Sequence, residues 1–261
     1  LKPLRIGNAA SMTEPQLIPL VLNTPFTVIK TLGKPGLEEK NYFNDGAELK
    51  YFNSDHQGSH QDSFIRKNII IIILESFSAE YIGTLNGGQG YTPFLDSLSN
   101  EGMLFTNAFA NAKKSIDGIP AVSASLPALM PVSFITSAYG ANKVSSLPNI
   151  LSKNGYSSAF FHGGNNGTMG FDQFARLAGY QQYFGRNEYG TQDYDGNWGI
   201  YDEPFLSFVS KTCESLKQPF ITTVFTLSSH HPYSIPTPLK GKFKKGTLPI
   251  HESIEIGRAH V

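Results

Sequence analysis

The sequence has one cysteine, no net charge and no long apolar run, and each of these absences excludes a class of protein. Cys213 alone cannot build an internal disulfide framework. Lys and Arg total 21, as do Asp and Glu, so no overall positive field would hold a nucleic acid. No run reaches the roughly 20 apolar residues of a membrane span. The remaining composition, with 40% hydrophobic residues in 261, is typical of a globular domain.

The two ends of the sequence predict segments that are not part of the folded domain. The chain opens on Leu1 without an initiator methionine or a signal-peptide core, so we expect upstream sequence to be missing. Residues 1–67 hold five prolines and no sustained period, which predicts a linker or lead-in. Residues 256–261 are predicted to be a non-native tail, because codons for Glu255–Val261 can contain the start of a sequencing-library adapter. The alternative is an ordinary polar tail.

From residue 68 onward, strand patterns alternate with helix patterns, which predicts an α/β domain. Residues 68–74 contain five consecutive isoleucines. Because this run does not alternate with polar residues, it predicts a central strand buried on both faces of a parallel sheet. Further strands are expected at 103–108, 156–161 and 220–226, and helices at 92–102, 148–154 and 202–213.

Polar side chains follow three of the predicted strands. Glu75 follows the first, His162 ends the second, and His230 comes soon after the third. The carboxyl ends of parallel strands meet at one edge of a sheet, where α/β proteins bind ligands. Carboxylate and imidazole groups together are ligands expected for a catalytic divalent metal. Each residue alone has another interpretation, as a solvated loop carboxylate or a structural histidine.

Ser115 is the candidate nucleophile. It follows Lys114 where a loop enters a predicted helix, so free backbone N–H groups and the helix dipole would favour a phosphate or sulfate there. A metal bound to the hydroxyl would lower its pKa, and Lys114 would offset charge on the substrate. The alternative is that Ser115 is a plain N-cap.

These motifs, in this order, resemble the sulfatase-like branch of the alkaline phosphatase superfamily, and especially its lipoteichoic acid synthase-type phosphoglycerol transferases. The resemblance extends over residues 68–238. It is carried by Leu74-Glu75-Ser76, Tyr91–Leu98, Lys114-Ser115, Phe161-His162-Gly163, Trp198–Glu203 and Ser228–Tyr233.

The resemblance implies a three-layer α/β/α sandwich of the alkaline phosphatase type, with a mostly parallel sheet that is incomplete at the C-terminus. Residues 68–255 would be a partial catalytic domain. The domain would lie on the extracytoplasmic or periplasmic side of the cell membrane, behind membrane helices encoded upstream. The implied reaction is transfer or hydrolysis of a phosphoglycerol- or phosphoethanolamine-type headgroup on a lipid or glycan, with no nucleic acid involved.

The resemblance also assigns roles to single residues. Glu75 and Ser115 would bind a divalent metal, with manganese favoured over zinc or magnesium. Ser115 would form the covalent phospho-intermediate. His230 would be catalytic at the departing oxygen, and His230, His162 and Lys114 would bind the substrate.

The sequence departs from the family pattern in three places. The Asp-His pair that completes the metal site is absent, so we expect the fragment itself to be inactive. Residues 164–172 lack the acidic residue, Trp and Arg with which glycerophosphate polymerases bind the headgroup. Residues 115–119 lack the motif that sulfatases convert to formylglycine. Two alternatives stay open, namely a sulfatase or phosphomonoesterase, and a non-catalytic binding or sensor domain.

Overall fold

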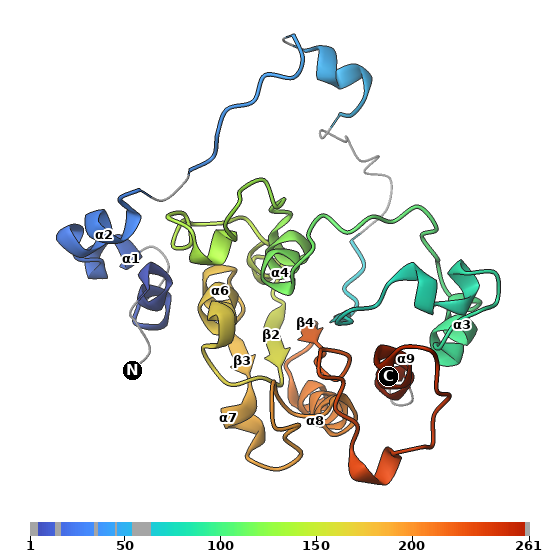
Figure 1. The fold of residues 1–261 in the computed structure, drawn as a ribbon. Coiled ribbons are helices and arrows are strands. Elements are labelled where there is room, and N and C mark those ends of the chain that lie inside the picture. The colour runs from blue at the N-terminus through green and yellow to red at the C-terminus, as the bar shows by residue number, and fades with distance from the viewer. Residues whose placement is uncertain (1–4, 14–16, 34–35, 45, 54–63, 259–261) are drawn as a thin grey trace.

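Four parallel strands form one sheet in the part of the chain that the computed structural model describes, which is residues 5–13, 17–33, 36–44, 46–53 and 64–258. The strand order is β1-β4-β2-β3, and Figure 1 shows β3, β2 and β4 beside one another. The strands are β1 (Ile69–Ile73), β2 (Ser157–His162), β3 (Gln182–Phe184) and β4 (Phe220–Phe225). The predicted strands at 68–74, 156–161 and 220–226 are therefore confirmed to within two residues.

Nine α-helices connect or flank these strands within the described residues. They are α1 (Ile18–Val21), α2 (Thr24–Thr31), α3 (Pro93–Ser99), α4 (Ser115–Ala124), α5 (Leu147–Ser152), α6 (Phe171–Leu177), α7 (Arg186–Tyr189), α8 (Asp202–Ser215) and α9 (Pro249–Arg258). The predicted helices at 92–102, 148–154 and 202–213 correspond to α3, α5 and α8. Among the described residues, no helix has both the length and the apolar character needed to cross a membrane.

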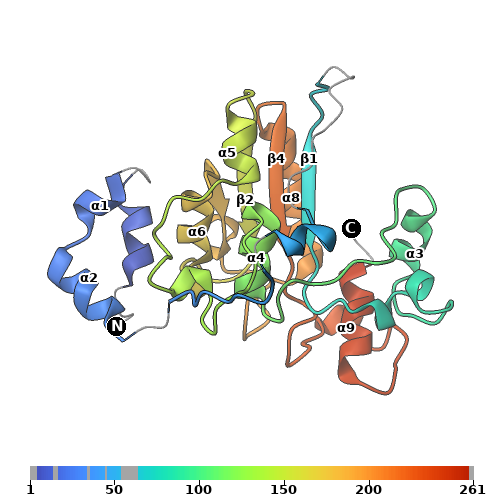
Figure 2. The same cartoon turned by 90° about the horizontal axis from the view of Figure 1, so that it is seen from above.

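Helices cover both faces of the sheet, so the domain has three layers (Figure 2). Side chains of β2 and β4 point alternately to the two faces and feed two apolar cores. Phe160 and Phe225 pack in a core with α4 and α6. Phe161 and Val224 pack in a second core against α8. This is the α/β/α arrangement that the sequence predicts.

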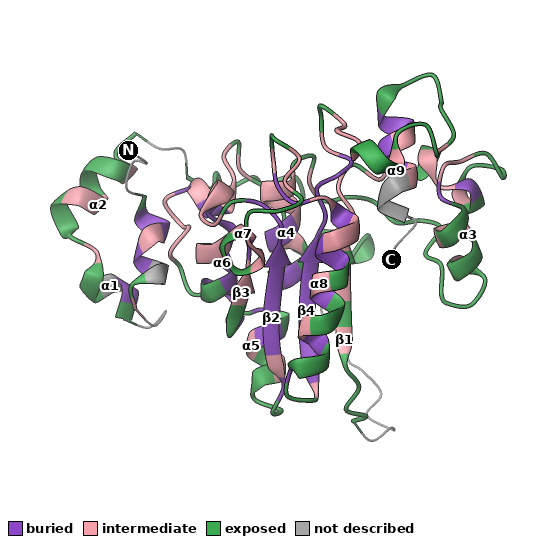
Figure 3. Cartoon of the chain, turned by 90° about the horizontal axis from the view of Figure 1, so that it is seen from below, coloured by how far each residue is buried: buried purple, intermediate pink, exposed green. Residues whose placement is uncertain are grey.

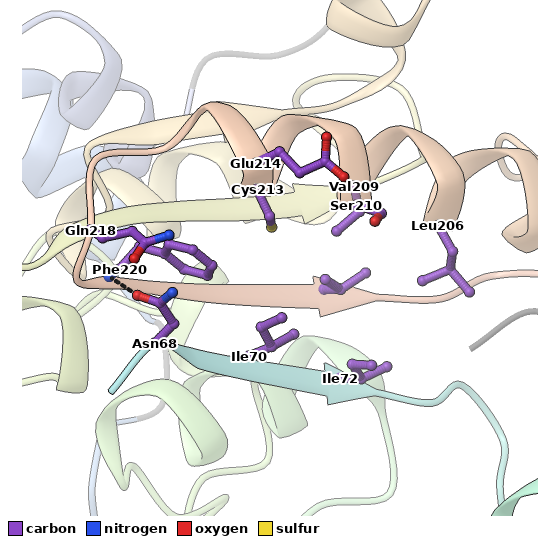
Figure 4. Close-up of a pocket in the computed structure, with 11 residues that line it drawn as sticks. Asn68, Ile70, Ile72, Leu206, Val209, Ser210, Cys213, Glu214, Gln218 and Phe220 are labelled. Atoms are coloured by element: carbon purple, nitrogen blue, oxygen red, sulfur yellow. Dashed lines mark hydrogen bonds between the residues drawn. The ribbon is translucent and has the colours of Figure 1, made fainter. Parts of the chain in front are cut away.

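β1 differs from the prediction of a central strand buried on both faces. Within the described part of the chain it is an edge strand, paired only with β4, and the side chains of Ile70 and Ile72 are 54% and 38% exposed (Figure 3). The prediction is wrong because the five isoleucines determine only that the segment is a strand. The exposure of its side chains depends on how many strands and helices pack beside it. The isoleucine side chains instead form one wall of an apolar groove, with Leu206 and Val209 of α8 on the other (Figure 4).

The predicted strand at 103–108 is also wrong. The segment forms turns and extended chain, with Met103 83% and Phe105 71% exposed. Its apolar residues resemble those of a strand, but no described strand lies beside it to pair with its backbone.

Residues predicted to be an irregular lead-in contain short helices. They include η1 (Ile6–Ser11), which packs against α6. Ala9 and Ile18 are buried in the same core as Phe174 of α6. Helix α2 begins at an N-cap, where Asn23 Oδ1 accepts a hydrogen bond from the Phe26 N–H at 3.0 Å. Such short helices bury too few residues to show a period in the sequence.

Candidate active site

The predicted metal ligand and the predicted nucleophile are in direct contact. Ser115 Oγ donates a hydrogen bond to Glu75 Oε2 at 2.6 Å. Glu75 follows the carboxyl end of β1, and Ser115 is the first residue of α4. Forty residues separate the two in sequence, so the fold itself brings them together. Both side chains are half-buried, which leaves them accessible to a ligand.

Ser115 does not cap its helix. The N-cap of α4 is Lys114, with extended backbone and no side-chain capping bond. The Ser115 hydroxyl instead hydrogen-bonds to Glu75 across the site. The alternative of a plain N-cap is therefore wrong. Lys114 is exposed directly beside the nucleophile position. The first N–H groups of α4 have no acceptor inside the helix, so this end favours an anion.

The backbone of Glu75 is held from both sides by the chain that follows β4. The Glu75 N–H donates to Thr226 Oγ1 at 3.0 Å, and the hydroxyl of Ser229 donates to the Glu75 carbonyl. Ser76 Oγ donates to Glu75 Oε1 at 2.9 Å, so each carboxylate oxygen receives a hydrogen bond. Sequence reasoning did not identify Thr226 and Ser229 as supports, because their partners lie about 150 residues away.

His230 lies in the same loop as Ser229, at the edge of the sheet that carries Glu75. Its ring is half-buried and lies 4.1 Å from the ring of Trp198. The position agrees with the prediction that His230 joins Glu75 and Ser115 at one edge. The predicted role at the departing oxygen remains a prediction.

Asp202 anchors the His230 loop to α8. Its Oδ1 accepts hydrogen bonds from the N–H groups of Leu227 at 2.7 Å and Ser228 at 3.1 Å. In return, the Asp202 N–H donates to Ser228 Oγ at 2.8 Å. Burial raises the pKa of Asp202 to about 6, although these hydrogen bonds act in the opposite direction. Asp202 thus fixes the start of the loop without facing solvent.

His162 is placed differently from the other predicted site residues. Its side chain is 1% exposed, stacked on Phe225 and edge-on to Phe171. Burial lowers the pKa of His162 to about 3, so the imidazole is neutral at physiological pH. Its Nδ1 lies 3.4 Å from the hydroxyl of Tyr183. The ring is therefore enclosed by aromatic side chains, and its predicted contact with a phosphate remains a prediction.

Gly164 lies against the ring of His162. A Cβ at this position would lie 2.5 Å from Cε1 of His162, which is closer than real Cβ contacts. An acidic residue after the His-Gly pair would thus displace the His162 ring.

The donor atoms of the site suit a hard divalent cation but form only part of its coordination shell. The carboxylate of Glu75 and the hydroxyl of Ser115 are the oxygen ligands that Mn²⁺ and Mg²⁺ prefer. The described residues contain no group of three or more His, Cys, Asp or Glu side chains that could hold a metal ion. Two ligands are fewer than the four to six that such an ion takes.

Residues 67–254 match the family model described as Sulfatase. The chain belongs to the sulfatase family. The match covers all four strands, the helices from α3 to α8 and the whole candidate site.

Relatives within the sulfatase family agree with the predicted resemblance. Lipoteichoic acid synthase 1 of Bacillus subtilis (strain 168) is 35% identical over 186 residues, which cover 65% of this chain and 27% of that protein. The chain thus spans about a quarter of the length of such curated relatives.

Solved structures of the alkaline phosphatase superfamily share the fold. A superfamily member from Vibrio parahaemolyticus has a TM-score of 0.67 at 27% identity, covering 74% of this chain and 48% of that one. The lipoteichoic acid synthase LtaP from Listeria monocytogenes has a TM-score of 0.61 at 26% identity, covering 74% and 49%. The sulfatase-like assignment and the parallel α/β fold are both confirmed.

Proposed function

We propose that this sulfatase-family chain carries the nucleophile of a metal-dependent enzyme that transfers or hydrolyses a phosphate-linked headgroup. The observation that supports it is the 2.6 Å contact between Ser115 Oγ and Glu75 Oε2 at the start of α4. A serine hydroxyl needs a nearby base that accepts its proton, or a cation that stabilises its ionised form, before it can attack phosphorus. The Glu75 carboxylate is a base within hydrogen-bond reach of the hydroxyl proton, and it is held in place at both its side chain and its backbone.

In the first step, Ser115 Oγ attacks phosphorus and the bond between phosphorus and the lipid or glycan alcohol breaks. The hydroxyl proton leaves along the hydrogen bond toward Glu75. A divalent cation held by Glu75 and Ser115 would lower the pKa of the hydroxyl and offset negative charge on the phosphate. Lys114, exposed beside the nucleophile, adds a positive charge on the same side.

His230 transfers a proton to the leaving oxygen and takes a proton from the attacking oxygen. In the first step it gives a proton to the leaving alcohol, so that no free alkoxide is formed. In the second step it takes a proton from the incoming alcohol or water, which attacks phosphorus and releases Ser115. A free alcohol acceptor gives transfer, and water gives hydrolysis.

The similarity to lipoteichoic acid synthases and the position of Gly164 support a proposal for the substrate class. Lipoteichoic acid synthases act on phosphoglycerol-type headgroups, and we propose the same broad class of phosphate-linked headgroup here, on a lipid or glycan at the outer face of the membrane. Because Gly164 leaves no room for an acidic side chain, we propose a headgroup that is recognised differently from glycerophosphate.

The test is Ser115→Ala in the full-length protein, with phosphatidylglycerol and phosphatidylethanolamine vesicles as probes and Mn²⁺ present. We expect diacylglycerol release to fall by roughly 10³-fold or more, because no other hydroxyl is bound to Glu75 from α4. Intact mass measurement should detect a phosphate-linked adduct on wild type and none on the variant. Ser152→Ala, an exposed serine on α5, is the matched control and should keep the wild-type rate.

Wild-type turnover by Ser115→Ala would show that the nucleophile is another group. Added glycerol separates transfer from hydrolysis, since only a transferase forms the glycerol adduct of the headgroup. If the protein binds Mn²⁺ and the vesicles yet gives no turnover and no adduct, a binding role replaces the catalytic one.

A further inference from the structure

Trp198 packs directly on His230. Their ring centroids lie 4.1 Å apart with the planes tilted by 50°. Trp198 Nε1–H also donates a hydrogen bond of 2.6 Å to the carbonyl oxygen of His231. One tryptophan thus contacts both the imidazole and the backbone beside it.

The loop that carries Trp198 is rigidly built around one carboxylate oxygen. Asp195 Oδ1 accepts the backbone N–H groups of Asn197 at 2.8 Å, Trp198 at 2.8 Å and Gly199 at 3.0 Å. Three donors on one oxygen fix the orientation of the backbone from which the indole projects.

The same loop is tied to the end of β2. Gly199 forms an antiparallel bridge with Gly164, and the Ile200 N–H donates to the Gly163 carbonyl at 3.1 Å. A Cβ at Gly199 would lie 2.6 Å from the Gly163 oxygen and from Leu227 Cδ1. The Trp198 loop is therefore closely packed at Gly199 between the chain after β2 and the chain after β4.

The His231 carbonyl determines which nitrogen of His230 carries the proton. His230 Nδ1 lies 2.8 Å from this oxygen. A carbonyl oxygen can only accept, so Nδ1 must be the donor. In the neutral imidazole the proton is then on Nδ1, and Nε2 keeps a free lone pair. The indole N–H fixes the same carbonyl from another side, because a carbonyl oxygen has two lone pairs.

We propose that Trp198 is a positioning residue that holds His230 in the Nδ1–H tautomer, with Nε2 directed to the reacting oxygens. The part concerning the reacting oxygens rests on the proposed function, and the tautomer does not. Free neutral histidine favours the opposite tautomer, with the proton on Nε2, so the effect is measurable without any turnover.

The first experiment is long-range ¹H–¹⁵N NMR on the ¹⁵N-histidine-labelled chain at a pH of about 8, where an ordinary histidine is neutral. His230→Gln identifies the His230 signals by their loss. We expect a protonated-type ¹⁵N shift at Nδ1 and an unprotonated-type shift at Nε2. The reverse pattern, or two averaged shifts, would overturn the proposal.

The second experiment compares two conservative variants of one loop. Trp198→Phe keeps an aromatic ring against His230 but removes the indole N–H, so the Nδ1–H pattern should be lost or averaged. Tyr194→Phe removes the hydrogen bond from the Tyr194 hydroxyl to the Asn197 carbonyl and leaves Trp198 intact. It is the matched control and should keep the wild-type pattern. A wild-type pattern in Trp198→Phe would overturn the role of the indole.

The activity readout connects the tautomer to the reaction in the full-length protein. Trp198→Phe should lower kcat about tenfold with little change in KM, the lower range for losing a group that orients a histidine. If the NMR result holds and Ser115→Ala is fully active, the proposed function fails while the tautomer assignment stands. If Ser115→Ala is inactive and Trp198→Phe has wild-type kcat, the positioning role fails alone.

Discussion

β1 and β4 run side by side in register, from Ile69 opposite Ile221 to Ile73 opposite Phe225, yet their surroundings differ. Every residue of β4 is buried, whereas β1 alternates between half-buried and exposed (Figure 3). Glu75 follows the exposed strand, and the hydrogen bonds that fix its backbone come from Thr226 and Ser229 in the chain that follows the buried one. The chain after a fully buried strand thus supports the end of a more exposed one.

The largest expected effect is seen when an isoleucine is replaced by alanine in β4 and the result is compared with the same replacement in β1. Ile221→Ala, at 0% exposure, should lower the free energy of unfolding by about 3 kcal/mol, because it leaves a cavity in a packed core. Ile70→Ala, at 54% exposure, should cost less than about 1 kcal/mol. Urea unfolding of the chain measures both. Equal costs would mean that the outer face of β1 is covered in solution.

The second prediction concerns two buried groups beside the enclosed strands, His162 and Asp202. The folded pKa of His162 is about 3 against 6.5, so the unfolded chain binds more protons and stability rises with pH between these values. The folded pKa of Asp202 is about 6 against 3.8, so the folded chain binds more protons and stability falls as pH rises through that window. The two contributions oppose each other between pH 4 and 6.

Removing either ionisable group should reveal how the other one changes stability with pH. Relative to wild type, Asp202→Asn should make stability rise more steeply from pH 4 to 6, by at most about 1.4 kcal/mol per pH unit. His162→Gln should make stability rise less steeply than in wild type, or fall, over the same pH range. Urea midpoints at three pH values give both slopes. Parallel curves for wild type and both variants would show that neither group has the shifted pKa assigned to it.

The smallest expected effect on stability is at the exposed face of β1. Ile70→Lys should change the free energy of unfolding by no more than about 0.5 kcal/mol. It should, however, reduce self-association, because a charge disfavours pairing at an apolar strand edge that has no partner strand among the described residues. Ile150→Lys, at a similarly exposed isoleucine on α5, is the control. Sedimentation velocity measures both, and equal effects would show that the edge has no special role.

Strand identity could be predicted from the sequence, and strand order could not. The isoleucine run and the Phe220–Phe225 segment have unmistakable β-branched and aromatic content. β3 was missed because only Gln182–Phe184 pair with β2, too few residues for a pattern. The edge position of β1 was missed because it depends on which strands lie beside it.

The contact between Glu75 and Ser115 agrees with the prediction that both belong to one site, which rested on Glu75 directly following a strand and Ser115 beginning a helix. The residues that hold the site in place could not be predicted. Thr226, Ser229 and Asp202 act by hydrogen bonds to distant backbone or to the chain after β4, and such bonds leave no local sequence signal.

The backbone bonds of Glu75 also set an order of events during synthesis. Its partners Thr226 and Ser229 are translated 151 and 154 residues later. Until β4 pairs with β1, the backbone of Glu75 lacks both of these bonds, and only Ser76 and Ser115 can bond its carboxylate. Long-range contacts of this kind form slowly. A ribosome stalled before residue 226 would therefore display Glu75 without the backbone support that it has in the folded chain.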